Sequence, residues 1–452
     1  MLLVACWVAL RPLYAQQQYI GGIQLSGNHK TKDRIILREL TFKLGDTITY
    51  AALRTKLADS KQNIFNTTLF NSVSCTVQDT TAAALQVIIT VKERWYFYPI
   101  PVVELADRNF NVWWVEKKHD PQRLNAGVFL IKRNLRGRNE TMTTILELGY
   151  TNYISLQYDF PFIDKKMRKG LQLYSSFYSN KESAYITENN KQLFLRDDDH
   201  FVKQRFQTGA IFRYRTEIHV RHNLELNYTT YAITDTLMKA NPEYLLGGKK
   251  FQQFGLVRYL IELDYRDVRS YPLNGYYFTG QFTRWGLTPW DNVNLTELTC
   301  QVSKYTPIRN RIFLLQSLKF KTSAPDPQPY NLARSLGYLN DYVRGYEYYV
   351  IDGAHFAILR NEIKYCLVKK KLTSFSDKFD NLPFNIYVKG FVDLGYVKDN
   401  FFFRKNPLNN DLLAGYGLGA DIVTFYDLVF RYELTTNRLK ETRLYFSLRA
   451  MI

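Results

Sequence analysis

The side chains best suited to a specific polar interaction lie in two motifs that are far apart in the sequence. Arg344 is in the aromatic segment DYVRGYEYYVIDG, and Asp393 is in the segment GFVDLGYV. In an extended chain Asp393 shares a face with Phe391 and Gly395, because alternate side chains of a strand point the same way. An arginine and a carboxylate that meet away from bulk water form a charge-assisted, often bidentate pair. We therefore predict a contact between Arg344 and Asp393.

Catalytic and metal-binding chemistry has little support in the sequence. It contains no glycine-rich phosphate loop and no Gly-x-Ser-x-Gly motif, and its carboxylates follow ordinary strand polarity. The six histidines are few for zinc chemistry, and the four cysteines form no CxxC pair. We therefore predict no enzyme activity, no metal site and no cofactor.

The composition narrows the class of protein. The chain of 452 residues has 34 tyrosines and 30 phenylalanines, and tyrosine enrichment is typical of strands and of membrane interfaces. After residue 15 there is no run of 18 or more apolar residues, so the sequence predicts no membrane-spanning helix. Composition alone leaves a large soluble β protein and a membrane β-barrel about equally open.

The net charge of +18 makes nucleic acid the first partner to consider. However, the 60 lysines and arginines are scattered through alternating segments, and no basic tail or helix gathers them. A charged, water-filled interior or anionic lipid headgroups explain the excess better. We therefore expect no nucleic acid partner.

The first hundred residues differ from the rest in the spacing of their apolar residues. Residues 1–15 combine a short apolar run with Ala15 at a candidate cleavage position, which predicts a secretory signal peptide. Residues 19–95 then read as one strand, two stretches of helical spacing and two more strands, in the order β-α-α-β-β. Thr31 and Thr49 are the residues expected to cap the two helices.

Residues 110–452 lack helical periodicity and consist of alternating segments of about ten residues. We count about sixteen, the first at 110–117 and the last at 441–450, and we assign residues 96–109 to a linker. An even number of strands with alternately short and long connections is typical of an outer-membrane barrel, whereas a soluble sandwich shares only the alternation. The sequence therefore predicts a mainly β fold, a transmembrane antiparallel β-barrel preceded by one small α/β domain.

The small domain resembles a POTRA domain, the polypeptide-transport-associated module. The segment LSGNHKTKDRIILRELTFKLGD resembles the start of that module, and LFNSVSCTV resembles its return into the sheet. A three-stranded sheet of this kind leaves an edge of unpaired N–H and C=O groups, to which another chain can add a strand. We expect client polypeptides to bind at this edge strand, without assigning residues to it.

A POTRA module followed by about sixteen strands resembles the BamA/TamA superfamily. VRGY precedes the twelfth predicted strand, as that family's loop motif does, and a Phe-x-Asp-x-Gly motif lies on the thirteenth. The residues concerned are Val343, Arg344, Gly345, Tyr346, Phe391, Asp393 and Gly395.

In that family the loop folds back into the barrel, so the resemblance implies that Arg344 docks on the wall near Asp393. Glu362, which would face inward on the twelfth strand, is a competing partner. The alternative is a solvated arginine in a mobile outer loop. Barrels of this family usually finish on an aromatic residue, whereas this chain finishes YFSLRAMI, so Phe446 or Ile452 would have to serve any recognition role.

The resemblance implies a protein of the cell outer membrane, surrounded by outer-membrane lipids, with its POTRA domain in the periplasm. The leading hypothesis is assembly, in which unfolded β-barrel clients are inserted at the seam between the first and last strands. The alternatives are a secretion pore of the two-partner type, which would pass a secreted client protein, and an accessory or structural barrel of another complex. The chain has room for one POTRA module, fewer than an essential insertase or a two-partner pore usually carries, so an accessory role stays open. Periplasmic or lipoprotein subunits are the other partners to expect.

Overall fold

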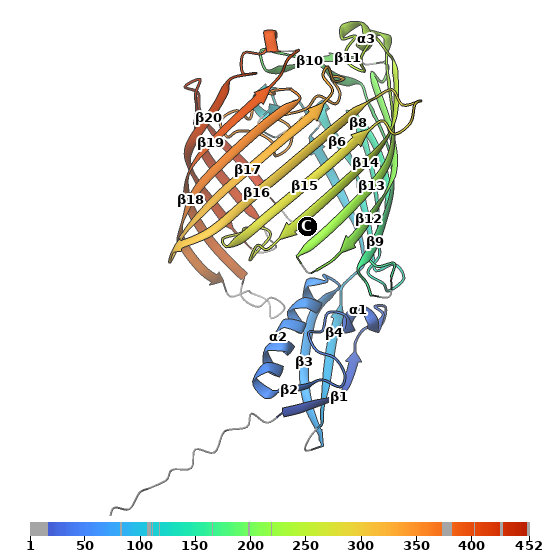
Figure 1. The fold of residues 1–452 in the computed structure, drawn as a ribbon, viewed down its shortest axis with the longest axis vertical. Coiled ribbons are helices and arrows are strands. Elements are labelled where there is room, and N and C mark those ends of the chain that lie inside the picture. The colour runs from blue at the N-terminus through green and yellow to red at the C-terminus, as the bar shows by residue number, and fades with distance from the viewer. Residues whose placement is uncertain are drawn as a thin grey trace, which may run out of the picture. The chain divides into compact units, whose positions relative to one another are not determined.

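The structure of the chain is a computed structural model (Figure 1). The described residues are 17–81, 84–105, 110, 112–116, 118–164, 166–197, 199–217, 219–372, 382–401, 403–424 and 428–449. The signal peptide expected at residues 1–15 and the terminal Ile452 lie outside them. The chain divides into two compact units, residues 1–98 with 130–142 and residues 99–129 with 143–452.

The first unit contains a four-stranded sheet and two helices. The strand order is β2-β1-β4-β3, in which β1 and β4 are parallel. The sequence predicts only three of these strands, because the short β2 offers too few residues for an alternating pattern to be recognised. The elements are β1 Gln17–Ser26, α1 Asp33–Leu37, β2 Thr47–Thr49, α2 Tyr50–Asn66, β3 Phe70–Thr81 and β4 Ala84–Glu93.

The two predicted helix caps turn out differently. The Thr49 hydroxyl accepts a hydrogen bond from the Ala52 amide at 3.4 Å, so the predicted cap of α2 is confirmed. The predicted cap at Thr31 is wrong, because α1 begins after Lys32, which makes no side-chain cap bond. Thr31 is instead buried, and its amide donates to the Glu93 carboxylate at 2.6 Å.

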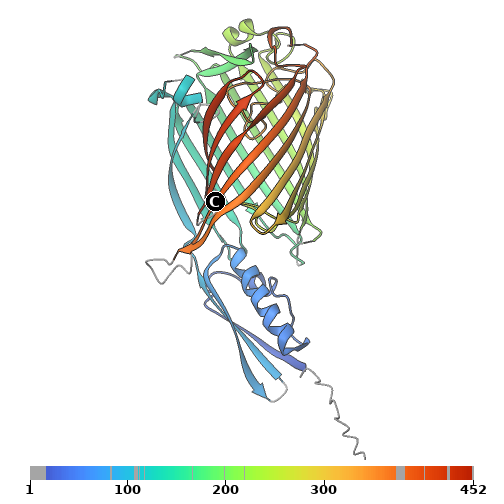
Figure 2. The same cartoon turned by 90° about the vertical axis from the view of Figure 1, so that its left-hand side faces the viewer.

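The second sheet has sixteen strands and curves into a barrel (Figures 1 and 2). The predicted fold class is therefore confirmed. In sheet order the strands are β5 Phe97–Leu105, β6 Leu124–Arg133, β7 Thr141–Gly149, β8 Thr151–Phe160, β9 Lys169–Asn180, β12 Lys203–Arg215, β13 Val220–Ile233, β14 Phe251–Asp264, β15 Gly275–Trp285, β16 Leu295–Arg309, β17 Ile312–Ala324, β18 His355–Leu372, β19 Leu382–Lys398, β20 Leu412–Val423, β21 Val429–Asn437 and β22 Thr442–Arg449.

Short elements lie between the strands. Two of them, β10 Glu182–Glu188 and β11 Lys191–Arg196, form a separate hairpin. The short helical segments are a π-helix at Val112–Glu116, 3-10 turns at Pro121–Arg123 and Phe403–Lys405, and α3 at Asp235–Ala240. None of the helices within the described ranges is long and apolar enough to span a membrane.

The start of the barrel differs from the prediction. The segment 96–109, expected to be a linker, contains strand β5, and the segment 110–117, expected to be the first strand, contains the π-helix. Pro99 and Pro101 explain the error, because a proline inside a run argues against a central strand. β5 is the terminal strand of the sheet, where a missing N–H is tolerated.

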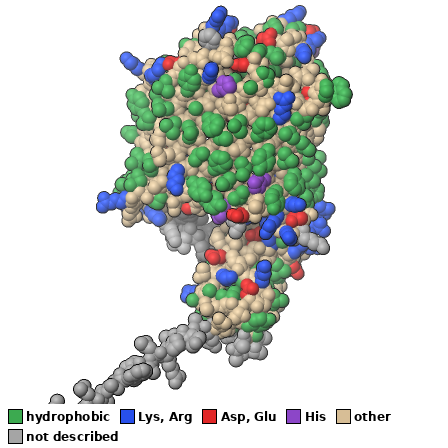
Figure 3. Space-filling model, viewed as in Figure 1, with side chains coloured by type: hydrophobic (Ala, Val, Ile, Leu, Met, Phe, Trp, Pro, Cys, Tyr) green, Lys and Arg blue, Asp and Glu red, His purple; other side chains and the backbone are tan. Residues whose placement is uncertain are grey.

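The outer surface of the barrel carries an apolar band (Figure 3). On β13 the side chains of Leu224, Leu226 and Tyr228 are exposed, whereas Glu225 and Asn227 between them are buried. A strand whose apolar side chains face outward and whose polar side chains face inward is the pattern of a lipid-facing barrel. A surface this apolar is stable in a bilayer and costly in water.

Candidate functional site

The segment between β17 and β18, residues 325–354, packs against the wall of the barrel, and we call it the inner loop. Its side chains Leu336, Val343, Tyr346 and Ile351 are buried in one apolar cluster. The other members come from β18, β19, β20 and the segment before β20, and they are Phe356, Ile358, Val397, Leu408 and Leu413. The inner loop is therefore a packed part of the fold.

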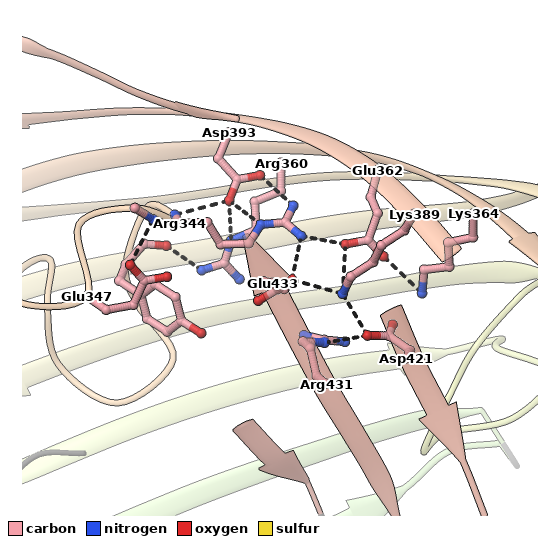
Figure 4. A network of polar contacts seen from close by, with 12 residues as sticks. Arg344, Glu347, Arg360, Glu362, Lys364, Lys389, Asp393, Asp421, Arg431 and Glu433 are labelled. Carbon is pink, nitrogen blue, oxygen red and sulfur yellow. Dashed lines mark hydrogen bonds and ion pairs between the residues drawn. The ribbon is translucent and has the colours of Figure 1, made fainter. Parts of the chain in front are cut away.

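Arg344 joins the inner loop to three strands (Figure 4). Its Nε and Nη2 each donate to one carboxylate oxygen of Asp393 on β19 at 2.7 Å. Its Nη1 donates to Glu362 on β18 at 2.6 Å and to Glu433 on β21 at 3.1 Å. The guanidinium carbon also lies 3.7 Å from the centre of the Phe391 ring. The planar fork of arginine suits this combination of a bidentate pair and a ring contact.

Around Arg344 the buried charges alternate in sign. The Lys389 ammonium lies 2.8 Å from both Asp421 and Glu433, and that of Lys364 lies 3.1 Å from Glu362. Removing any one member would leave a buried opposite charge with less compensation, which is costly. The cluster comprises Arg344, Arg360, Glu362, Lys364, Lys389, Asp393, Asp421, Arg431 and Glu433. No group of three or more His, Cys, Asp or Glu side chains in the described part of the chain is arranged to hold a metal ion.

Glycines let the inner loop lie directly on the wall. A Cβ atom at Gly395 would overlap the Val343 side chain, and one at Gly415 would overlap the carbonyl oxygen of Arg344. Within the loop Gly345 has a φ of +93°, a conformation that side chains disfavour. The close approach of the arginine therefore depends on glycines on both sides of the contact.

The inner loop also contacts the last two strands of the sheet. Asn437 at the end of β21 donates its side-chain amide to a loop carbonyl at 2.9 Å, and Tyr349 donates to Glu441 at 2.9 Å. The ring of Tyr348 lies 5.8 Å from that of Tyr445 on β22, centre to centre. The loop thus connects β18, β19, β21 and β22 from one side.

The structure brings the motif residues named from the sequence to one place. Arg344 contacts Glu362 in addition to Asp393, so the two carboxylates are joint partners. Tyr346 lies in the apolar cluster. The solvated alternative does not describe Arg344, whose side chain is only 6% exposed.

Strand alternation in the sequence also predicts that Arg360 and Lys389 face inward. Sequence reasoning missed the other four members of the charge cluster, which are Lys364, Asp421, Arg431 and Glu433. A usable signal was present on β20, where Gly415, Gly417 and Gly419 alternate and mark a face that something approaches closely. Asp421 continues that face.

The sheet of the first unit ends in two unequal edge strands. At one end β2 has only three residues, and at the other β3 has twelve. Along β3 Asn71, Ser74 and Thr76 are exposed, whereas Val73 is buried. The longer edge available for strand addition is therefore β3.

Comparisons with known proteins agree with this architecture. Residues 18–94 match the model of the POTRA family, whose description is "Surface antigen variable number repeat". No curated protein sequence matches the chain.

Solved structures match over nearly the whole chain at low sequence identity. BamA from Haemophilus ducreyi lacking POTRA domains 1–3 has a TM-score of 0.61 and 12% identity, over 96% of this chain and 85% of that one. CdiB from Escherichia coli has a TM-score of 0.55 and 11% identity, over 95% and 75%. CdiB from Acinetobacter baumannii has a TM-score of 0.53 and 10% identity, over 96% and 74%. The chain therefore shares the fold of these barrels.

Proposed function

Because this outer-membrane chain joins a POTRA domain to a barrel with the fold of the BamA/TamA superfamily, we propose that it is an assembly factor for other β-barrel proteins. Unfolded clients would be received at the POTRA sheet edge and inserted into the bilayer at the seam between β5 and β22. The observation that carries the proposal is the presence, in one chain, of a sheet with a long free edge and a barrel whose strand order has two ends.

Free strand edges are suited to this task for a physical reason. A strand crossing a bilayer must have every backbone N–H and C=O group paired, since lipid offers no partners. A client strand that pairs first with β3 and then with the seam would avoid unpaired groups at each stage. The free energy for insertion would come from the folding of the client, which buries its own backbone and apolar surface.

Depletion of the protein from its host, followed by quantitative proteomics of the outer membrane, tests the proposal. We expect a broad loss of β-barrel proteins, restored when the wild-type chain is supplied. Loss of a single secreted protein with unchanged barrels would favour a secretion pore instead. No change in either would leave an accessory or structural role.

A secretion pore is the second candidate function. The similarity to CdiB supports it nearly as well as the similarity to BamA supports an assembly factor. BamA and CdiB match with TM-scores of 0.61 and 0.55, so the fold does not choose between the two roles. In a pore the client would pass through the lumen, and the inner loop would have to leave its site. In an assembly factor the client stays at the seam, and the loop can remain docked.

A further inference from the structure

The two end strands of the barrel sheet differ in what they can offer to a new partner strand. The strand order begins at β5 and ends at β22, so each of these strands has one side that is not paired within the order. The backbone N–H and C=O groups of successive residues point alternately to the two sides of a strand. The hydrogen bonds on the paired side therefore identify the residues whose groups point to the unpaired side.

β22 offers a full set of backbone groups. The Asn437 amide donates to the Glu441 carbonyl at 3.1 Å, and the register between β21 and β22 continues from that pair without a bulge. Odd-numbered residues of β22 therefore face β21, and Leu444, Phe446 and Leu448 face the open side. None of them is a proline, so each has both an N–H donor and a C=O acceptor.

β5 offers an incomplete set. The Arg133 amide of β6 donates to the Tyr96 carbonyl at 2.7 Å, so the even-numbered residues that follow face β6. Pro99 and Pro101 then face the open side, and proline has no N–H. The same orientation follows from the general rule that a proline in a sheet turns its missing donor away from the ladder. The open edge of β5 thus lacks two donors in the middle of the strand.

The inner loop also holds β22 in place. Besides the contact with Tyr445, the ring of Tyr348 lies 4.6 Å from the guanidinium carbon of Arg443 on β22. The same tyrosine also clusters with Val112 of the π-helix. The inner loop therefore braces β22 through an aromatic contact and a cation–π contact, added to those with Asn437 and Glu441.

Resting on the proposed function, we propose that the incoming client strand pairs with β22 and displaces β5. Pairing with β5 would leave two carbonyl groups of the client unmatched in lipid, whereas β22 can match every group. A strand antiparallel to β22 runs in the direction of β5, and its lipid-facing side chains must be apolar beside Leu444 and Phe446. The expected substrate is therefore an alternating strand of a client barrel that runs in the β5 direction.

Hydrogen exchange of the β22 amides tests the seam without any client. The variant P99V/P101V adds two donors, so we expect the open-side amides of Leu444, Phe446 and Leu448 to exchange at least tenfold more slowly than in the wild type. Pro307→Val on β16 is the matched control and should leave them unchanged. The single variant P101V should give a smaller shift in the same direction and serves if the double variant folds poorly. Unchanged exchange in well-folded variants would overturn the inference.

Photo-crosslinking tests the direction of pairing. The full chain, carrying a photoreactive residue at Phe446 or at Val103, is reconstituted in lipid vesicles and given a urea-unfolded eight-stranded outer-membrane barrel as the probe. Faster insertion of the probe with crosslinks mainly from Phe446 supports the inference. Faster insertion with crosslinks mainly from Val103 overturns it and leaves the proposed function standing. An unchanged insertion rate with no crosslinks overturns both.

Discussion

Three buried carboxylates depend on one buried arginine, Arg344, to compensate their charge. Asp393, Glu362 and Glu433 are all nearly inaccessible to solvent, and each accepts a hydrogen bond from Arg344. Removing one partner of a buried ion pair typically costs about 3–5 kcal/mol, because the remaining charge is left uncompensated. The loop position is therefore sensitive to this single side chain.

We expect Arg344→Ala to release the inner loop from the wall, with a loss of stability of about 3–5 kcal/mol. Arg344→Lys should restore only part of it, since an ammonium cannot pair bidentately with Asp393. The readouts are protease cleavage within residues 325–354 and the heat-modifiable gel migration of the barrel. Arg438→Ala, which removes an exposed pair with Asp411, is the control. Wild-type cleavage and migration in Arg344→Ala would contradict the prediction.

The carboxyl group of Glu93 should make the stability of the POTRA domain depend on pH. Burial alone would raise its pKa, but hydrogen bonds from Thr31 and Lys30 outweigh burial and hold the pKa below the ordinary value. A lowered pKa stabilises the fold above the unfolded-state pKa, ~4.3, and that contribution is lost as the pH falls through the lower folded value.

We expect the amides of Lys30 and Thr31 to lose protection from hydrogen exchange between pH 7 and pH ~3, after correction for intrinsic rates. Glu93→Gln should lower their protection at pH 7 and remove most of the pH dependence. Asp59→Asn, at an exposed carboxylate of α2, should behave as the wild type. A pH dependence that survives in Glu93→Gln would assign it to another group.

At the scale of elements, β20 determines how closely the loop can approach the wall. Its alternate glycines leave a flat strip on one face of the strand, where the carbonyl of Arg344 lies against Gly415 and the Phe391 ring lies against Gly417. Any side chain at Gly415 would occupy the position of the Arg344 carbonyl.

We expect Gly415→Ala to displace the inner loop, at a cost of about 1–3 kcal/mol from overpacking. Gly390→Ala on β19 is a matched control, since a Cβ there would meet its nearest neighbour at an ordinary 3.6 Å. Protease cleavage of the loop should increase in the first variant only. Equal cleavage in both would show that β20 does not position the loop.

The same elements show how far the sequence alone could lead. The face shared by Phe391, Asp393 and Gly395 follows from alternation, which is a local property of one strand. The contact between Glu433 and Arg344 depends on the register of β21 and on the path of a loop 89 residues earlier. Neither has a local signature in the sequence. β5 was missed for a different reason, because its two prolines are acceptable only at the end of a sheet, and that position is a property of the whole fold.

At the scale of the whole molecule, the barrel and the POTRA domain have separate cores. The buried clusters of the barrel unit lie within residues 99–129 and 143–452. We expect removal of residues 18–94 to leave heat-modifiable migration intact and to lower the insertion rate of an unfolded client barrel to the rate in empty vesicles. Loss of heat-modifiability would show that the barrel needs the POTRA domain to fold. A retained insertion rate would show that the POTRA edge is not the receiving site.

The docked inner loop has a further consequence for the membrane in which the barrel stands. A sixteen-stranded barrel is wide enough to hold an aqueous channel. Here the chain's own tyrosines and charges occupy part of that space, and they stay there because Arg344 is costly to undock. The resting protein should therefore conduct few ions and exclude small antibiotics. A cell that carried an undocked loop variant would leak solutes even if every client were still assembled.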